Sequence, residues 1–526
     1  MKKIILAAWV LAVMPAAAQD TYESARLMGS DLNGTARYVG MGGAMDALGA
    51  DISTISTNPA GIGVFRHSNV SASFGLVSQA DAVKFDGLNK TNMSFDQIGF
   101  VYSSRVSPSS YINVGFNYHK SRNFDQILSA ANALRGCSQN GLTYYKAEKG
   151  IYEFDENNQG EIIGYEGNNR SWSYSESDYM NANALMLDPN DGNIYTIDAR
   201  AYSFDRAHRG WIADYDINLS GNAGDRFYWG LTVGIKDVNY KGYSEYAETL
   251  VDKDGDCGSM AIGDARKIKG TGFDVKAGLI FLPIEGSPFR IGVSVATPTF
   301  YDLTASNDSY LYNNCKYGAW DEGRSSESYD FKFYTPWKFG VSMGHTISNK
   351  VALGVGYEYS DWGASKNRIN DGSYYDWWSD EYYEDSHTDK PMKENTKRSL
   401  TGQHVLKAGM EIKPVPVLAL RLGYNYLSSP YEERGYRDMT LDSPGVSYSS
   451  TTDYVNWKDT HRFTCGLGVK AGGMNIDLAY QYSATNGDFH PFQDYSNQYS
   501  SAVFDSGVKE VSNKRHQVLL TLGYTF

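Results

Sequence analysis

Strict alternation of apolar residues with small or polar residues is the feature that most constrains how this chain folds. In residues 351–360 and 474–483, one face carries Val, Leu, Ile, Met and Tyr, and the other carries Gly, Ala, Ser, Asn, Gln and acidic residues. A period of two residues predicts β-strands with one apolar face. After residue 68 there are fourteen such segments, centred at Phe74, Phe100, Val114, Ile217, Leu231, Val275, Val293, Val341, Val355, Ala408, Leu420, Leu467, Leu478 and Leu520.

The connections between these segments are short and long in turn. The tight links NAGD, SNK, PVP and GG follow the fourth, eighth, tenth and twelfth segments. An even number of antiparallel strands, with short turns at one end and long loops at the other, is typical of bacterial transmembrane β-barrels. We therefore predict an all-β fold, a 14-stranded antiparallel transmembrane β-barrel over residues 69–526. Its predicted long connections are residues 120–210, which is the largest, 239–269, 301–335, 362–401, 428–458 and 485–513.

The second face of the predicted strands distinguishes a barrel from a soluble β-sandwich or propeller. A sandwich fills its core with inward side chains of both sheets, whereas the second face here carries glycine, serine and charge. We expect the apolar face to contact lipid and the charged face to line a wet or plugged lumen. The charged residues expected there are Lys407, Glu411, Arg421, Arg462, Lys470 and Asp477.

Tyrosines give an independent indication of topology. If the mature N-terminus lies in the periplasm, odd-numbered strands run outward and end at the outer interface of the membrane. A ring with a polar tip prefers the headgroup level, so tyrosines at these strand ends fit an aromatic belt. The residues concerned are Tyr118, Tyr357, Tyr359, Tyr424, Tyr426, Tyr480 and Tyr482.

The first residues, MKKIILAAWVLAVMPAAAQD, have two lysines, an apolar run and a small-residue site before Gln19. This pattern predicts a secretory signal peptide at residues 1–18, and with the barrel it predicts the outer membrane as the location. Residues 19–68 are too few for a separate domain with its own core. A barrel of fourteen strands is wider than its wall side chains can fill. We therefore expect residues 19–68 to fold inside the lumen as a hatch.

The stretch GMGGAMDALGADISTISTNPAGIG, residues 40–63, is crowded with glycine. A dinucleotide-binding fingerprint needs a third glycine where Met45 stands and a strand in front of it, so we expect no nucleotide cofactor. The glycines instead predict close approach of the backbone to the barrel wall. Within the stretch, the hatch motif Asn58, Pro59, Ala60 and Gly61 is expected to hold one rigid turn, because Asn bonds nearby backbone and Pro fixes φ. The inward charges Arg421, Arg462 and Glu411 are candidate partners for the exposed hatch backbone and for Asp46 or Asp51, and the sequence does not choose among them.

This sequence resembles the outer-membrane long-chain fatty acid and hydrocarbon transporters of the FadL type. The resemblance rests on GGAMDALGADISTISTNPAGIG with its Asn58-Pro59-Ala60, the signal peptide, the fourteen predicted strands and the terminal Phe526. It implies that Asn-Pro-Ala belongs to a hatch plugging the lumen and that the terminal aromatic marks the strand read by the barrel-insertion machinery. The sequence departs from the family in its long connection at 120–210 and its charged inner wall.

Motifs for catalysis and metal binding are weak. The run GVSMG, residues 340–344, spells a nucleophile elbow but lies inside an alternating strand, whereas an elbow needs a strand-to-helix turn. His345, His404 and His516 fall on the lipid-facing positions, and only His119 points inward, with no acid partner named by the sequence. The run DKDGDCG, residues 252–258, fails the EF-hand spacing and fits a solvated acidic turn better. We expect no enzymatic activity and no metal.

The cysteines show no metal-binding spacing, so we expect no zinc site. In an oxidising compartment two of Cys137, Cys257 and Cys315 are candidates for a disulfide. Cys465 shares the lipid-facing positions of its strand and is expected to stay unpaired. The net charge of −13 argues against a nucleic-acid partner.

An apolar stripe follows Asn123, which is a residue able to cap a helix. Its members repeat at helical spacing, which predicts a helix. Such a stripe usually packs against neighbouring elements, and the functional alternative is a surface that captures hydrophobic ligands above the barrel mouth. The members are Phe124, Ile127, Leu128, Ala131 and Leu134.

Two functions fit these features. The first is passive uptake of a hydrophobic small molecule, such as a long-chain fatty acid, with this molecule and the outer-membrane lipids as partners. The second is a barrel-anchored binding or secretion-associated surface protein without transport, which the long, acidic and tyrosine-rich loops favour.

Overall fold

The computed structural model describes residues 19–526 except 81, 158–159, 165–172, 189, 253–254, 316–321, 349, 377, 379–380 and 497–502. The predicted signal peptide at residues 1–18 lies outside the described residues. None of the helices among the described residues is long and apolar enough to span a membrane.

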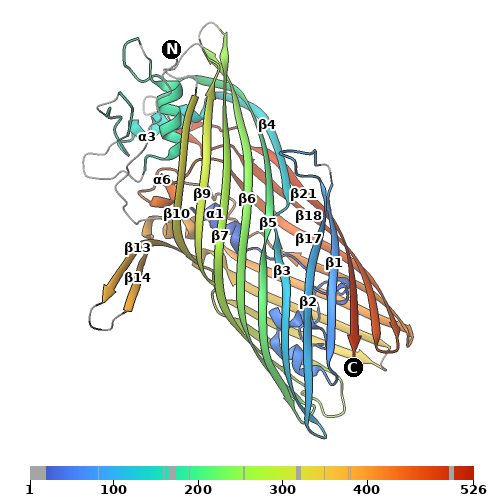
Figure 1. Cartoon of the computed structure of the whole chain (residues 1–526). Helices are drawn as coiled ribbons and strands as arrows, with labels where there is room; N and C mark the ends of the chain where they lie inside the picture. Colours follow the sequence, from blue (N-terminus) through green and yellow to red (C-terminus); the bar gives the residue numbers. More distant parts are fainter. Residues whose placement is uncertain are drawn as a thin grey trace.

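A closed antiparallel barrel of fourteen strands forms the body of the protein (Figure 1). Each barrel strand pairs with the next, and the last pairs with the first along Asn69↔Thr525 to Gln79↔Arg515. The fourteen predicted centres all fall inside barrel strands. These strands are β1 (Asn69–Gln79), β2 (Thr91–Ser107), β3 (Ser110–Asn123), β5 (Asp198–Ala223), β6 (Phe227–Asp252), β7 (Gly255–Phe281), β8 (Arg290–Ala296), β11 (Lys338–Ile347), β12 (Val351–Asp361), β15 (Gly402–Val415), β16 (Leu418–Leu427), β17 (Tyr454–Ala471), β18 (Met474–His490) and β21 (Lys509–Thr525).

The predicted tight links connect β5 to β6, β11 to β12, β15 to β16 and β17 to β18. We call the end of the barrel that holds these links the turn end and the opposite end the loop end. The apolar positions of the strands face outward and are exposed, as predicted; Val355 and Phe463 keep 58% and 55% of their surface. Of the predicted lumen charges, Lys407, Glu411, Arg421, Arg462 and Asp477 are buried, whereas Lys470, near the turn end of β17, is exposed.

The loop end contains more regular structure than the sequence predicts. β5, β6 and β7 are 26, 26 and 27 residues long and continue at the loop end far beyond the other barrel strands as a tall ribbon (Figure 1). The long connections predicted at 239–269 and 301–335 are therefore largely strand and not loop. The strands that flank this ribbon or pair beside it are β4 (Gln126–Cys137), β9 (Phe300–Asn313), β10 (Glu322–Tyr334), β13 (Lys366–Asp376) and β14 (Glu381–Thr388).

Short helices cover the inner side of this ribbon and share an apolar cluster with it. Leu142, Met180 and Leu185 pack there against Phe204 and Phe489. The elements of the loop end are α3 (Gln139–Glu148), α4 (Glu176–Asn181), the π-helical turn η3 (Ala182–Met186), η4 (Trp362–Ala364), α5 (Lys390–Ser399), α6 (Pro444–Ser447), β19 (Tyr495–Ser496) and β20 (Val503–Phe504).

The N-terminal segment runs through the barrel from one end to the other. α1 (Thr21–Met28) packs against α5 at the loop end, α2 (Ala36–Gly40) packs against β16, β17 and β18, and the 3-10 turns η1 (Ile52–Ser56) and η2 (Pro59–Val64) pack against β3, β5 and β6. Contacts with strands on several sides of the wall place this segment in the lumen, as Figure 1 shows for the blue helices.

The predicted topology assumed that the mature N-terminus lies at the periplasmic end of the barrel, which is the end with the short turns. The position of Gln19 corrects this premise. Gln19 is fully buried, and its Oε1 accepts a hydrogen bond from Tyr329 Oη of β10 at 2.9 Å. β10 belongs to the loop end, so the hatch begins there and not at the turn end. The strand directions nevertheless remain as predicted, because the hatch crosses the lumen before β1 starts at the turn end.

The structure also selects among the candidate cysteines. The Sγ atoms of Cys257 and Cys315 lie 3.0 Å apart, whereas Cys137 is buried and its thiol donates to the Asp505 carbonyl at 3.3 Å. Cys465 is exposed on the outer face, as expected.

We predict that Cys257 and Cys315 form a disulfide when the protein is exported to an oxidising compartment. The bond joins residues 58 positions apart, and closing a loop of this kind typically adds about 2–4 kcal/mol of stability. Peptide mapping without reductant should recover the two cysteines in one linked pair, and Cys137 and Cys465 as free thiols. Recovery of Cys137 in a disulfide would contradict this prediction.

Candidate functional site: the plugged lumen

Glycines in the wall allow the hatch backbone to lie directly against the strands. A Cβ atom at Gly354 would lie 1.9 Å from the Ala44 carbonyl oxygen, and one at Gly409 would lie 2.2 Å from the Met41 carbonyl oxygen. Real side chains do not approach backbone so closely, so only glycine fits at these positions. The close approach predicted from the glycine-rich hatch therefore also depends on glycines of β12 and β15.

The Asn58 motif forms one tight turn against β6 and β7. Asn58 Oδ1 accepts from the Ala60 backbone N–H at 3.2 Å and caps η2, and its Nδ2 donates to the Leu279 carbonyl at 3.5 Å. Pro59, Ala60 and Gly61 are buried, and the Gly61 carbonyl accepts from the Ala50 N–H at 3.0 Å. The motif thus links two turns of the hatch to the wall, close to the turn end.

Ion pairs between hatch and wall lie deeper in the lumen. Asp46 pairs with Lys407 at 3.0 Å, and Arg37 pairs with Glu411 at 3.0 Å. Arg462 donates to the Ser30 carbonyl at 3.1 Å. Arg462 therefore binds the hatch backbone, which is one of the roles predicted for the inward charges.

Two other predicted partners differ. Arg421 pairs with Glu411 and Asp477 of the wall, at 2.7 and 2.6 Å, and its side chain makes no hydrogen bond or ion pair with the described residues of the hatch. Asp51 accepts from Thr35 Oγ1 at 2.9 Å inside the hatch and pairs with none of the wall charges predicted for it. Lys407, the actual partner of Asp46, was predicted only as a lumen residue, because sequence spacing does not show which inward charges face each other.

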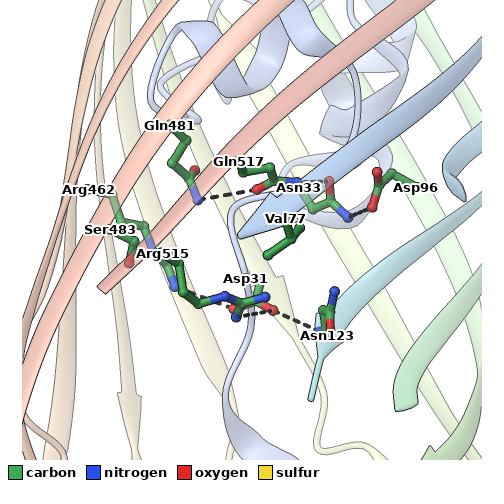
Figure 2. A pocket seen from close by; sticks show the side chains of 10 residues that line it. All are labelled: Asp31, Asn33, Val77, Asp96, Asn123, Arg462, Gln481, Ser483, Arg515 and Gln517. Carbon is green, nitrogen blue, oxygen red and sulfur yellow. Dashed lines mark hydrogen bonds and ion pairs between the residues drawn. The ribbon is translucent and has the colours of Figure 1, made fainter. Parts of the chain in front are cut away.

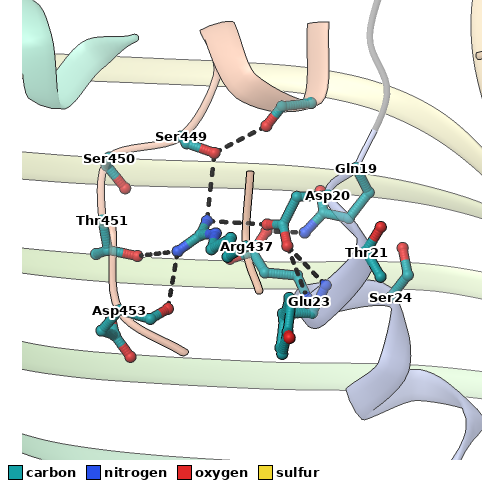
Figure 3. Close-up of polar contacts among 12 residues, drawn as sticks. Gln19, Asp20, Thr21, Glu23, Ser24, Arg437, Ser449, Ser450, Thr451 and Asp453 are labelled. Carbon is teal, nitrogen blue, oxygen red and sulfur yellow. Dashed lines mark hydrogen bonds and ion pairs between the residues drawn. The ribbon is translucent and has the colours of Figure 1, made fainter. Parts of the chain in front are cut away.

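A cluster of polar contacts fastens the start of the hatch to the loop end (Figure 3). Arg437 donates to Asp20 Oδ2 at 2.9 Å, to Ser449 Oγ at 3.2 Å and to the Asp453 carbonyl at 3.1 Å. Asp20 in turn caps α1 by accepting from the Tyr22 N–H at 2.8 Å. The guanidinium and the carboxylate are both buried, so neither has water as an alternative partner.

A cavity of about 160 Å³ separates the hatch from the wall. Its apolar part comes from Leu27, Met28 and Leu32 of the hatch and from Ile212 and Tyr301 of the wall. Its polar part carries both charges. The cations that line it are Lys236, Lys276, Lys338, Lys407 and Arg462, and the carboxylates are Asp31, Asp214, Asp274 and Glu358. The cavity is therefore amphiphilic, with apolar side chains and charges of both signs.

The acidic groups beside this cavity are largely occupied by wall lysines. Lys276 pairs with Asp216 at 2.9 Å and with Asp274 at 3.3 Å, and Lys236 pairs with Asp214. His119 is buried and points inward, as predicted, with its Nδ1 3.7 Å from Asp216 Oδ2. The acid partner of His119 comes from β5, which the sequence did not identify.

A strap of the hatch, residues 29–33, separates this cavity from a smaller one of about 30 Å³ (Figure 2). Asp31 lies 3.9 Å from Arg462 and 3.8 Å from Arg515, and it accepts from the Asn123 N–H at 2.8 Å. Asn33 donates to Asp96 at 3.0 Å. The strap is therefore held on both sides by charged or amide groups of the wall.

The helix predicted after Asn123 is wrong. Residues 126–137 form strand β4, which pairs with β5. Four members of the predicted capture surface are buried and divide among three apolar clusters, whereas Ala131 is exposed. These are Phe124, Ile127, Leu128 and Leu134. The side chains therefore pack on neighbours, which was the structural alternative for this stripe.

The structure also shows where the two weak motifs GVSMG and DKDGDCG lie. Ser342 of GVSMG points inward within β11 and donates to the Gly292 carbonyl at 3.4 Å, far from any strand-to-helix turn. The acidic run 252–258 connects β6 to β7, and its residues 253–254 lie outside the described part of the chain.

Glu176 of α4 is a buried carboxyl group at the loop end, outside the barrel wall. Its Oε2 accepts from Asn307 Nδ2 at 2.6 Å and from Ser325 Oγ at 2.9 Å. Burial raises the pKa of Glu176 to about 8 from its ordinary value of 4.5. The folded loop region therefore holds a proton that the unfolded chain releases between these two values.

We predict that the loop region becomes less stable as pH rises through this window. A raised carboxyl pKa means that the folded state binds more protons than the unfolded state, so its stabilising contribution is full below pH 4.5 and lost by about pH 8. Limited proteolysis at pH 5 and pH 9 should cut α3 and α4, residues 139–148 and 176–181, faster at the higher pH. In Glu176→Gln this difference should shrink, and an unchanged difference would contradict the assignment to Glu176.

Comparison with known proteins agrees with the architecture. No protein-family model and no curated protein sequence matches this chain. Among solved structures, a Pseudomonas aeruginosa FadL homologue is 11% identical, with coverage of 94% of this chain and 99% of that chain and a TM-score of 0.51. The Ralstonia pickettii toluene transporter TbuX is 11% identical over 94% of this chain and 99% of its own, with a TM-score of 0.46. The CymD monoaromatic hydrocarbon channel is 9% identical over 95% and 99%, with a TM-score of 0.48. The chain therefore has the fold of the FadL homologue, a closed barrel of fourteen strands.

Proposed function

We propose that the protein is an outer-membrane channel for the passive uptake of hydrophobic small molecules. The observation that carries this proposal is the cavity between hatch and wall, which combines apolar side chains with cations. The exposed apolar band of the barrel supports membrane insertion, and the fold shared with a FadL homologue is consistent with it. The concentration gradient of the solute supplies the driving force in this proposal.

The cations of the cavity favour an amphiphile with an acidic group, of which a long-chain fatty acid is the simplest. Lys338 lines the cavity, and its side chain makes no hydrogen bond or ion pair with the described residues. Lys236, Lys276 and Lys407 are already paired with carboxylates of the wall or hatch. Lys338 is therefore the cation best placed to bind a carboxylate.

The hatch serves as the gate in this proposal, and the Asn58 turn is its fixed end. The turn holds one conformation because Asn58 caps it and Pro59 fixes a dihedral angle. Movement of the strap at residues 29–33 opens a path past the cavity without release of this turn. No catalytic step is part of the proposal.

The rival function is a barrel-anchored surface protein without transport. The observation that favours it is the tall ribbon of β5 to β7 with its cover of short helices, which is a large structured surface at the loop end.

Uptake of labelled oleate into cells with and without the protein separates the two functions. We expect uptake to depend on the protein, and equal uptake would favour the rival. Lys338→Met should lower oleate uptake by about tenfold, because one charge-assisted hydrogen bond contributes about 1.5–3 kcal/mol. Lys390→Met, on the exposed face of α5, is the matched control. Uptake of labelled toluene should be the same in both variants, since toluene has no acidic group.

The gate is tested in the same assay with Asn58→Ala combined with Pro59→Gly. This double variant should change oleate uptake and admit small ions, because the hatch turn loses its cap and its fixed dihedral angle. Asp308→Ala, at an exposed position of β9, is the control. If the double variant and the control both behave like the parent, the turn only fills space.

A further inference from the structure

Three clusters of tyrosine and histidine repeat on the outward face of the barrel, near the loop end. In each, a strand that runs toward the loop end carries Tyr-x-Tyr, and the strand that returns beside it carries a histidine. We call these the Tyr–His clusters. They are Tyr357, Tyr359 and His404 on β12 and β15; Tyr424, Tyr426 and His461 on β16 and β17; and Tyr480, Tyr482 and His516 on β18 and β21.

The geometry of the three clusters is the same. The histidine lies directly across from the second tyrosine, and the two ring centroids are 5.2, 5.4 and 5.1 Å apart in chain order. The histidine Nδ1 lies 2.8 Å from the hydroxyl oxygen of the first tyrosine in every cluster. Each histidine ring is thus fixed by one hydrogen bond and by ring contacts with both tyrosines of its cluster.

This arrangement leaves the second ring nitrogen available. When the tyrosine hydroxyl donates to Nδ1, the proton of a neutral imidazole sits on Nε2. Among the described residues, none hydrogen-bonds to Nε2 of His404, His461 or His516. With this tautomer the clusters present three oriented N–H donors on the outward face, where His404 and His461 are exposed and His516 is half-buried.

The level of the three histidines relative to the membrane follows from the residues next to them on the same strands. Two positions further along each returning strand stand Leu406, Phe463 and Val518, which are exposed and belong to the apolar band. On the other side of each histidine the chain enters the loop end. Rings with polar tips at the edge of an apolar band lie at the level of lipid headgroups.

The neighbouring charges distinguish the three clusters. Lys514 precedes His516 by two residues and shares its outward side of β21. The equivalent position is Asp459 before His461, where the carboxylate accepts from Tyr426 Oη at 2.8 Å, and Gly402 before His404. A cation beside the N–H donor favours an anionic ligand, so the His516 cluster is the strongest of the three.

We propose that the Tyr–His clusters bind the phosphate groups of membrane lipid headgroups in the leaflet at the loop end. A phosphate oxygen accepts the Nε2–H, and at His516 Lys514 adds a second, charged donor. The acyl chains then lie along the exposed apolar residues of the same strands. The inference rests on the proposed membrane location but not on the transported molecule.

Native mass spectrometry of the full-length protein in micelles tests this inference. The probes are phosphatidylglycerol and a diacylglycerol with the same acyl chains, which lacks the phosphate. We expect phosphatidylglycerol to bind more tightly, and the combined change His404→Phe, His461→Phe and His516→Phe to weaken it about tenfold, equivalent to about 1.4 kcal/mol. Phenylalanine keeps the ring contact and removes the donor. His345→Phe, on the outward face of β11 near the turn end, is the control.

Further arms give each outcome a meaning. Lys514→Gln should weaken phosphatidylglycerol binding without any change to the ring contacts, so it tests the proposal even if the triple variant folds poorly. The proposal would be overturned if parent, Lys514→Gln and triple variant all bound phosphatidylglycerol equally. It would also be overturned if the triple change weakened diacylglycerol binding as much as phosphatidylglycerol binding, because the clusters would then be only an aromatic belt. Displacement of the lipid by millimolar inorganic phosphate would point to free phosphate as the ligand. Oleate uptake by the triple variant is measured in a separate experiment. If the variant loses lipid binding but still takes up oleate, the lipid site and the proposed transport function are independent.

Discussion

Gly354→Val is expected to displace the hatch while leaving the barrel closed. The new side chain would occupy the space of the Ala44 carbonyl, which a Cβ atom would already approach to 1.9 Å. The wall is held by continuous backbone pairing with β11 and β15, so the hatch is the part that moves. In planar bilayers the variant should conduct small ions at least about tenfold better than the parent. A tenfold shift toward the open state needs about 1.4 kcal/mol, and overpacking a close contact typically costs about 1–3 kcal/mol.

Ala408→Val is the matched control for this change. Ala408 is exposed on the outer face of β15, directly across from Val355. The added methyl groups there contact no part of the hatch, so conductance should equal that of the parent. If Gly354→Val conducts as little as Ala408→Val, the hatch tolerates the overlap and does not seal the lumen by contact with this glycine.

Arg437→Ala is expected to release the start of the hatch from the loop end. The change leaves Asp20 as a buried carboxylate without its 2.9 Å partner and removes the donor for Ser449 and the Asp453 carbonyl. Breaking one side of a buried ion pair costs about 3–5 kcal/mol. Hydrogen exchange in Thr21–Met28 should therefore accelerate by at least about a hundredfold, since each 1.4 kcal/mol corresponds to a factor of ten.

Arg324→Ala provides the comparison, because it removes an ion pair of similar length in an exposed setting. Arg324 and Asp308 lie 2.8 Å apart, with 73% and 50% of their side chains accessible. Exposed pairs contribute about 0–1 kcal/mol, so exchange in α1 should stay as in the parent. Unchanged exchange in Arg437→Ala would show that apolar packing of α1, and not the polar cluster, holds the hatch at the loop end.

The barrel strands are predictable from sequence because lipid on one side and a polar lumen on the other impose a period of two on each strand. The hatch is predictable as a lumen segment because its length and glycine content leave few other places for it. The stripe after Asn123 shows the limit of periodicity. Leu128 and Leu134 fit a helical spacing, yet Leu128, Ala130 and Leu134 also lie an even number of residues apart. Pairing with β5 decides between the two, and this pairing is a long-range contact.

The path of the hatch and its partners could not be predicted for a related reason. Arg437 anchors Asp20 across 417 residues of sequence, and a single arginine in a loop carries no pattern that indicates its partner. Asp46 likewise faces Lys407 only because the strands stagger in a particular register. The tyrosines of the Tyr–His clusters, together with His404 and His516, were predicted separately at the outer interface or on lipid-facing positions, whereas His461 was not identified. Their pairing required the register of three strand pairs.

The burial of Gln19 at the loop end has a consequence for how the protein is assembled. Residues 19–68 run the whole length of the lumen before β1 begins, and β1 forms the seam with β21. The closed barrel therefore surrounds the hatch, which lies along the barrel axis. If the hatch instead entered a barrel that was already closed, the carboxylate of Asp20 or of Asp46 would have to move past the cation that pairs with the other. These cations are Arg437 for Asp20 and Lys407 for Asp46. We therefore expect residues 19–68 to lie along the barrel axis before the β1–β21 seam closes around them.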